Sequence, residues 1–371
     1  MTRHTIPWWN TAIGEAEKHG LLRAFDQRRF TTGSVAEELE RRLSDLLDVP
    51  HVVLVNSGTS ALTISMLVAG VGPGDEVIVP DFTWVATAQA AALLGARVIA
   101  IDSRPDHPNM DLGEVERKLS DRTRVILPMH FHGRANDMLV LRALASQVGA
   151  VLVEDACKAL MCRTPRGYLG TVGDIGCFSL GMISLFSIGY GGFLVTRNDE
   201  FAARARLLRD HGVERDGEER LSLLGSNFKV SDLLAAVGIE QIKRVDEKLS
   251  HVHKVYDRYL EGLANLNEVW VEEVDLANNE VPLCVDVMSP RREELIAFLN
   301  DHGVGASRLH KPMHTAPYLG ITGDFVNATR FSEQGFMPPC GPSQSLENVD
   351  HTIDLIREWS FSLSRCEVVQ T

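Results

Sequence analysis

The sequence predicts an α/β fold in which a large, mostly parallel sheet is followed by a smaller α+β unit. From about residue 35 to residue 200, short apolar segments alternate with amphipathic helical segments, the pattern of parallel strands joined by covering helices. Beyond about residue 264 this alternation gives way to a mixed pattern that ends in a helix. A length of 371 residues also favours two cores over one.

The first unit is predicted from hydrophobic periodicity. Its helices show an apolar stripe at helical spacing, and its strands are short apolar runs bounded by turn residues. The expected helices are 35–47, 59–67, 84–94 and 139–147. The expected strands are 52–55, one within 72–80, 96–103, 123–131 and 150–156, and the glycines of 189–192 suit a turn into an edge strand.

The second unit follows a long helical region over 230–264. We expect a strand at 281–288, a helix at 291–300, a loop rich in proline and histidine at 310–318, and a terminal helix at 346–363. The predicted domains are therefore 1–250, a large domain with an N-terminal arm at 1–34, and 251–371, a small α+β domain.

Composition excludes several classes of function. Fifty acidic and 37 basic residues give a net charge of −13, a field that repels nucleic acid. No apolar stretch is long enough for a membrane span, and the N-terminus has no apolar signal core. The six cysteines are scattered without a CxxC pair, which favours free thiols and argues against a zinc site. We expect a cytoplasmic protein without a metal.

Three segments at predicted strand ends carry polar residues. Gly58 and Thr59 follow a strand and open a helix, which suits either a phosphate cradle or a plain capping turn. Asp155 ends a buried strand, where it needs a cationic partner or serves as a helix cap. Ser179 follows the run Gly-Cys-Phe and could add a hydroxyl to a phosphate site.

In this order and spacing the segments resemble the DegT/DnrJ/EryC1/StrS family of sugar and aminocyclitol aminotransferases, which are fold-type I pyridoxal-phosphate enzymes of the aspartate aminotransferase-like fold. The resemblance covers nearly the whole chain. It is carried by TTGSVAEELERRLSDLL, VNSGTSAL, VPDFTWVATAQAAALLGA, PMHFHGRANDM, VEDACKA, GDIGCFS, GYGGFLVT, SNFKVSDLLAAVGIEQI, LHKPMHTAPY and MPPCGPS.

The resemblance implies pyridoxal 5'-phosphate or pyridoxamine 5'-phosphate as cofactor and assigns residues to it. Phosphate contacts would come from Gly58, Thr59 and Ser179. Trp84 would stack on the pyridine ring, and Asp155 would pair with its nitrogen. Asn227 would reach the phosphate of the neighbouring subunit, which implies a homodimer with shared sites.

The resemblance also implies the substrate, a keto sugar or keto cyclitol, together with an amino donor. By analogy, 211–222 and 310–318 would line the entrance, with His310, Lys311 and His314 as substrate-binding candidates. His132, at the end of a predicted strand, is an acid/base candidate and equally a satisfied buried histidine.

One position departs from the family. Members carry a lysine five residues after the serine of the Phe-Ser pair, where it forms the Schiff base with the cofactor, and this chain has Ser184 there. Lys158 is the only lysine between residues 119 and 228. Tyr190 and Lys229 depart as well. Three explanations stand: an engineered exchange, natural divergence that retains the cofactor, or a base relocated to Lys158.

The predicted function is family-type C–N chemistry without the usual lysine. The first alternative is a lysine-independent, pyridoxamine-phosphate-dependent dehydration of a keto-deoxy sugar. The second is a non-catalytic chain that stabilises an active homologue as its heterodimer partner, since loss of the lysine is typical of such a subunit. A cofactor-binding regulator is a third reading.

Overall fold

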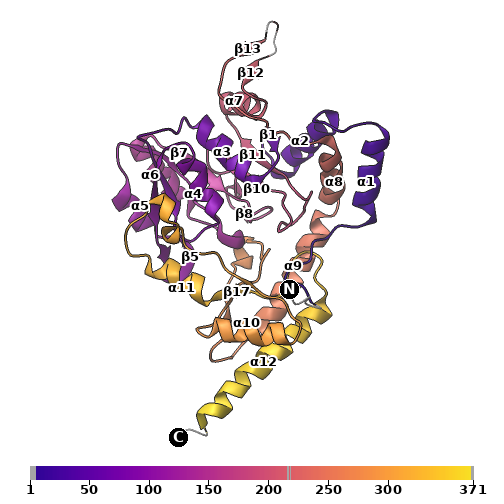
Figure 1. Ribbon diagram of the computed structural model, residues 1–371, viewed down its shortest axis with the longest axis vertical. Helices are drawn as coiled ribbons and strands as arrows, with labels where there is room; N and C mark the ends of the chain where they lie inside the picture. The colour runs from indigo at the N-terminus through magenta and orange to yellow at the C-terminus, as the bar shows by residue number, and fades with distance from the viewer. Residues whose placement is uncertain (1–5, 215–216, 218, 369–371) are drawn as a thin grey trace.

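The computed structural model describes residues 6–214, 217 and 219–368. A seven-stranded sheet occupies the upper part of the molecule in Figure 1, and a four-stranded sheet lies below it. The C-terminal helix α12 (Leu346–Val368) extends beyond the second sheet at the bottom of the view. The predicted α/β fold with a large, mostly parallel sheet is confirmed.

The large sheet has the strand order β1-β11-β10-β7-β6-β2-β3. Neighbouring strands from β10 to β3 are parallel, whereas β11 runs antiparallel between β1 and β10. The prediction of an edge strand after the glycine-rich turn was wrong, because β1 pairs with the outer side of β11. The strands are β1 (His51–Val55), β2 (Glu76–Pro80), β3 (Arg97–Ile101), β6 (Thr123–Ile126), β7 (Val151–Asp155), β10 (Ile175–Ser179) and β11 (Gly192–Thr196).

Helices cover both faces of this sheet, as its sequence pattern requires. In β1, Val53 and Val55 belong to one core cluster, and Val52 and Leu54 belong to another, so alternate residues are buried on opposite faces. The helices are α1 (Glu15–Asp26), α2 (Ser34–Leu47), α3 (Gly58–Val68), α4 (Val85–Ala92), α5 (Leu112–Lys118), α6 (Met138–Val148), α7 (Asp199–Arg209) and α8 (Asp232–Ile242).

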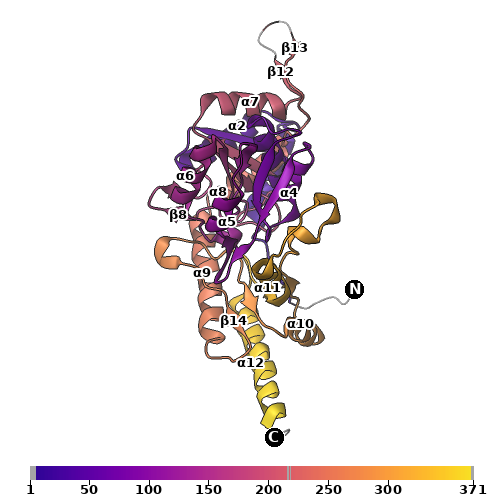
Figure 2. The same cartoon turned by 90° about the vertical axis from the view of Figure 1, so that its left-hand side faces the viewer.

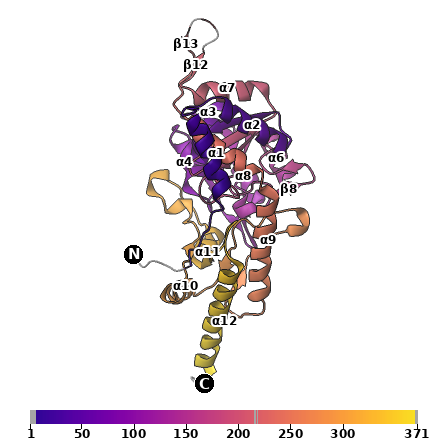
Figure 3. The same cartoon turned by 90° about the vertical axis from the view of Figure 1, so that its right-hand side faces the viewer.

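The long helix expected over 230–264 is two helices. Helix α8 ends at Ile242, and α9 (Val245–Gly262) starts after Arg244, whose φ of −115° and ψ of 18° are not helical. The break lets α8 pack on α1 and α2 while α9 packs on α12; Figure 3 shows the two directions. Both halves carry an apolar stripe, so the periodicity does not mark a two-residue interruption.

The second sheet is antiparallel, with the order β14-β15-β17-β16, and shares a core with α9, α10 and α12. Only the last two residues of the strand expected at 281–288 form it, because 281–286 are buried in an irregular path. The elements are β14 (Trp270–Val271), β15 (Val287–Met288), β16 (Ser307–Arg308), β17 (Gly335–Met337), α10 (Arg292–Asp301) and α11 (Val326–Gln334).

The N-terminal segment lies along this second sheet. Ile6 forms a bridge with Val304, and Trp9 forms one with Cys340; Figure 2 shows α10, which ends shortly before Val304, in the lower half of the molecule. The division into domains 1–250 and 251–371 stays a prediction, and residue 250 falls within α9.

Three short hairpins and four 3-10 turns complete the described chain. No helix in its described ranges combines the length and apolar character needed to cross a bilayer. The short elements are β4 (Ser103–Arg104), β5 (His107–Met110), β8 (Arg163–Thr164), β9 (Gly167–Tyr168), β12 (Val213–Glu214), β13 (Arg220–Leu221), and 3-10 turns at Phe131–Gly133, Leu276–Asn278, Met313–Thr315 and Pro317–Leu319.

Candidate active site

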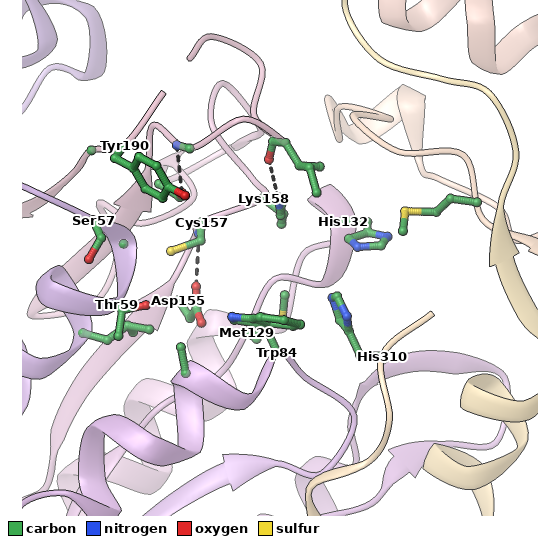
Figure 4. Close-up of a pocket in the computed structure, with 18 residues that line it drawn as sticks. Ser57, Thr59, Trp84, Met129, His132, Asp155, Cys157, Lys158, Tyr190 and His310 are labelled. Atoms are coloured by element: carbon green, nitrogen blue, oxygen red, sulfur yellow. Dashed lines mark hydrogen bonds between the residues drawn. The ribbon is translucent and has the colours of Figure 1, made fainter. Parts of the chain in front are cut away.

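A cavity of about 290 Å³ lies between the two sheets. Its walls include residues that follow the carboxyl ends of β1, β2, β7 and β10, together with Met337 from β17 and His310, which follows β16. The carboxyl edge of a parallel sheet is where such folds bind ligands. Figure 4 shows Ser57 and Thr59 on one side of the cavity and His132 and His310 on the other.

One side of the cavity is the start of α3. Ser57 caps this helix by accepting a hydrogen bond from the Ser60 amide at 3.0 Å, and the first-turn residues Gly58 and Thr59 line the cavity. First-turn amides have no partner within their helix and attract anions. A Cβ on Gly58 would lie 2.9 Å from Cys157 Sγ and 3.0 Å from the Cβ of Ser179, so only glycine fits. Ser179 also lines the cavity, so the predicted phosphate residues are brought together.

Asp155 lies at the end of β7 and is only 2% exposed. Its Oδ2 accepts a hydrogen bond from Thr87 Oγ1 at 2.8 Å, and its Oδ1 accepts one from the Cys157 amide at 3.1 Å. Thr87 was not identified from the sequence, although it sits one helical turn after Trp84. These contacts orient a buried carboxylate toward the cavity, where a cationic ligand group would pair with it.

Trp84 precedes the first residue of α4 and contributes a flat aromatic surface to the cavity wall. Its side chain is 56% exposed, and its ring centroid lies 5.3 Å from that of His310. A planar ligand can stack on such a surface, and the stacking role of Trp84 stays a prediction.

Ser184 lies outside the cavity lining, whereas Lys158 is part of it. Ser184 is 2% exposed, and its hydroxyl donates to the carbonyl oxygen of Ser179 at 3.1 Å. The ammonium of Lys158 donates to the carbonyl of Ile183, and burial lowers the pKa of Lys158. Among the described residues that line this cavity, Lys158 is the one lysine.

Two histidines form the wall opposite Thr59 (Figure 4). His132 Nδ1 lies 2.7 Å from Asp286 Oδ1. His310 has a buried Nε2 without a hydrogen-bond partner among the described residues, and burial, followed by the charges of His132 and Lys158, lowers its pKa to about 3. Its imidazole is therefore neutral near pH 7. Nearby His130 is fully buried against Glu154 at 2.8 Å and does not line the cavity.

The remaining candidate site residues lie outside the cavity lining of a single chain. His314 Nδ1 contacts Asp81 Oδ2 at 2.6 Å, and its ring stacks on Phe325 at 5.0 Å. Lys311 lines two neighbouring hollows but not the cavity, and Asn227 forms a backbone bridge with Asp210. The expected entrance segment 211–222 lies partly outside the described residues, which omit 215, 216 and 218.

The arrangement can bind a small, planar, anionic ligand. An amide-rich helix start, a buried carboxylate, an indole and an amine surround one cavity. Its volume is at the lower end for ligand pockets, which start at about 300 Å³. Among the described side chains, no group of three or more His, Cys, Asp or Glu is placed to hold a metal ion.

Comparison with known proteins gives a consistent result. Residues 11–357 match the DegT/DnrJ/EryC1/StrS aminotransferase family. The chain is 31% identical to the dTDP-3-amino-3,4,6-trideoxy-alpha-D-glucose transaminase of Streptomyces venezuelae over 92% of this chain and 91% of that protein. It is also 31% identical to the GDP-perosamine synthase of Caulobacter vibrioides, over 77% and 79%.

Solved structures agree with this match. The S. venezuelae DesV structure, in complex with a ketimine intermediate, superposes with a TM-score of 0.90 at 30% identity, covering 96% of this chain and 98% of that one. The aminotransferase TlmJ from Streptoalloteichus hindustanus has a TM-score of 0.92 at 28% identity, covering 96% and 99%.

Proposed function

This chain belongs to the DegT/DnrJ/EryC1/StrS aminotransferase family, and we propose that it binds pyridoxal or pyridoxamine phosphate in the cavity beside α3 and carries out C–N chemistry on a keto sugar or keto cyclitol. When bound, this cofactor supplies an electron sink for bond cleavage next to the substrate nitrogen. The observation that carries the proposal is the meeting of the α3 start, Asp155, Trp84 and Lys158 around one cavity.

Each of these groups matches a part of the cofactor. The amides of Gly58 and Thr59 and the hydroxyl of Ser179 would bind the phosphate. The Asp155 carboxylate, held by Thr87 and the Cys157 amide, would keep the ring nitrogen protonated. Trp84 would stack on the ring and exclude water from one face.

Lys158 would supply the amine that Ser184 cannot. The Ser184 hydroxyl is engaged by the Ser179 carbonyl and does not line the cavity. The amine of Lys158 does line it, and the lowered pKa favours the neutral form that attacks a carbonyl.

The substrate class is supported by the relatives. The names of two of them specify dTDP- and GDP-linked sugars. A cavity of about 290 Å³ leaves little room beyond the cofactor, so a nucleotide group would bind toward its mouth. An amino donor would use the same site in the other half of a transamination.

The test is a visible absorption spectrum of the chain mixed with pyridoxal phosphate, recorded before and after borohydride and followed by peptide mapping. We expect reduction to attach the cofactor to Lys158, and Lys158→Met to abolish that attachment. The matched control is Lys254→Met, at an exposed helical position of α9, which leaves the attachment unchanged. No spectral change with either cofactor form would contradict the proposal.

A second function, dehydration without a lysine, is favoured by one observation. His132 lines the cavity and could move a proton in place of an amine. Cofactor that binds and stays unattached after borohydride would support this alternative. The non-catalytic reading predicts instead that the chain co-purifies with a lysine-containing homologue and has no turnover alone.

A further inference from the structure

His132 is held at the cavity wall by a buried carboxylate from the second part of the chain. The distance from His132 Nδ1 to Asp286 Oδ1 is 2.7 Å, and both side chains are 1% exposed. Asp286 directly precedes β15, so 154 residues separate the two partners. A carboxylate at Nδ1 leaves the other ring nitrogen, Nε2, to face a ligand.

Asp286 is itself held by Arg134. Arg134 Nη1 donates to Asp286 Oδ2 at 2.6 Å, and its other nitrogens donate to the carbonyls of Glu272 and Glu273 at 2.7 and 2.8 Å. Burial raises the pKa of the Asp286 carboxyl, but the charges of His132 and Arg134 outweigh burial and lower it overall. Asp286 is therefore ionised at neutral pH and accepts the proton that His132 carries on Nδ1.

The backbone at His132 is in the left-handed region, with φ 47° and ψ 35°. Few residues other than glycine adopt this conformation, and it is retained where the surroundings enforce it. Gly133, with φ 99°, follows directly, and a Cβ there would lie 2.2 Å from the carbonyl oxygen of Val281. The tight turn thus fixes the position of the His132 backbone, and Asp286 fixes the orientation of its imidazole ring.

His310 faces the same end of the cavity. Its ring centroid lies 5.9 Å from that of His132, at an interplanar angle of 77°. Its buried Nε2 has no partner among the described residues, although a buried polar atom normally has one. The other charged groups at this end are Asp286, Arg134 and Lys158. A neutral imidazole with an unpaired nitrogen is suited to bind a hydroxyl or carbonyl oxygen of a ligand.

We propose that His132 transfers protons at the sugar end of this cavity, that Asp286 and Arg134 are its positioning residues, and that His310 binds the same polar group of the substrate. The inference rests on the proposed function. His132 Nε2 accepts a proton from the incoming amine as that amine adds to the sugar carbonyl, and the imidazolium is balanced by Asp286. The proton then passes from Nε2 to the former carbonyl oxygen, which leaves as water, so the C–N bond formed and the C–O bond broken balance without another reagent.

The test is the protonation pattern of His132, read by ¹⁵N NMR of histidine-labelled full-length chain without cofactor. We expect Nδ1 to carry the proton and Nε2 to be bare in the neutral form. In Asp286→Asn, Arg134 still requires an acceptor, so the amide oxygen faces Arg134 and the amide NH2 faces His132. The proton then moves to Nε2. His130, paired with Glu154, is the internal control whose signals stay in place.

A wild-type His132 that carries its proton on Nε2 overturns the inference, whether or not the variant folds. So does an Asp286→Asn chain whose His132 signals stay in place. The NMR measurements need no cofactor, whereas the proposed function is tested by the absorption spectrum with pyridoxal phosphate. Failure of the inference and failure of the proposed function can therefore be distinguished.

Kinetics of the cofactor-loaded chain provide the second measurement. With His132→Gln we expect kcat to fall at least 100-fold while the cofactor spectrum is retained, because acid–base groups contribute about 10²–10⁴-fold. With His310→Phe we expect KM to rise about 10-fold or more, with a smaller change in kcat. An unchanged kcat in His132→Gln overturns the proton-transfer role.

Discussion

At the scale of single residues, the candidate site separates into positions found from local sequence and positions found only in three dimensions. Gly58 and Asp155 each end or follow a predicted strand, and Ser179 is the last residue of β10, so one sheet edge brings them together. Asp286 could not be predicted, because 154 residues separate it from His132 and no spacing rule links them. His310 was assigned to substrate, but its unpaired Nε2 is a property of packing.

The position of Ser184 leads to a first prediction. We expect Ser184→Lys to raise transamination above the parent chain, because an amine there restores the group that the family carries five residues after the serine of its Phe-Ser pair. Initial rates of amino transfer to a keto sugar measure this. Ser184→Ala, which removes only the hydrogen bond to Ser179, should leave the rate near the parent value. Slower transamination in Ser184→Lys than in the parent would contradict the assignment of position 184 to the family's lysine position.

The buried carboxylate gives a second prediction. Asp155→Asn should weaken cofactor binding about 10- to 100-fold, since a hydrogen bond to a charged group contributes about 1.5–3 kcal/mol. Absorbance titration with pyridoxal phosphate measures the affinity. Asp174→Asn, at a part-buried carboxylate paired with Arg142 outside the cavity, is the control. Equal affinities in the Asp155 variant and the parent would show that Asp155 does not contact the ring.

At the scale of elements, periodicity predicted the parallel strands β2, β3, β6 and β7, because strands buried on both faces are continuous apolar runs. It did not predict β10, which is parallel to β7. Periodicity failed where the place or length of an element depends on its contacts with distant segments. Strand β11 looked like an edge strand but lies between β1 and β10. The break between α8 and α9 carries no glycine or proline, so packing of the two halves on different partners determines it. Helix α1 was subsumed in an N-terminal arm, because the residues it buries, Glu17, Gly20 and Ala24, form no stripe of large apolar side chains.

Arg134 connects the turn after β6 to the segment that follows β14 and to the residue that precedes β15, which gives a third prediction. Arg134→Met should lower the free energy of unfolding by about 3–5 kcal/mol, because it leaves Asp286 buried with one cation fewer. Urea denaturation measures the loss. Arg124→Met, at an exposed ion pair with Asp75, should cost less than about 1 kcal/mol. Equal losses in the two variants would refute the structural importance of the buried pair.

The lowered pKa of Asp286 gives a fourth prediction, for acid. A carboxylate whose pKa is lower in the folded chain stabilises it fully above the unfolded value of about 4, and this stabilisation disappears as the pH falls through the folded pKa. The gap in unfolding free energy between the parent and Asp286→Asn should therefore not narrow between neutral pH and about pH 4, and should narrow below it. A gap that narrows already between pH 7 and pH 5 would contradict the lowered pKa. Denaturant titrations at several pH values measure it.

At the scale of the whole molecule, the homodimer that the resemblance implies would explain one residue outside the cavity and two exposed apolar side chains. Asn227 lies outside the cavity, and Leu221 and Leu224, in and after the β12–β13 hairpin, are 84% and 91% exposed. Figure 1 shows this hairpin projecting from the top of the molecule. Large exposed apolar side chains on a projecting hairpin suit a subunit contact.

Hybrid dimers provide the fifth prediction. On its own, the Lys158→Met chain should lose cofactor attachment, and the Asn227→Ala chain should lose cofactor affinity. If Asn227 serves the neighbouring subunit, mixed dimers regain one intact site, which contains Lys158 of one chain and Asn227 of the other. Borohydride labelling after mixing should then reach about a quarter of the wild-type level at random pairing. No recovery in dimers shown to have exchanged subunits would place Asn227 in the site of its own chain.

The bridges from Ile6 to Val304 and from Trp9 to Cys340 have a consequence for biosynthesis. Ile6 and Trp9 pair with residues made more than 290 positions later, so they leave the ribosome long before their partners exist. Trp9 also donates to the carbonyl of Met182 at 2.8 Å, two residues before Ser184. The cavity itself is lined by His310 and Met337, so it is completed only after these residues have left the ribosome, and a nascent chain stalled before that point lacks a finished site.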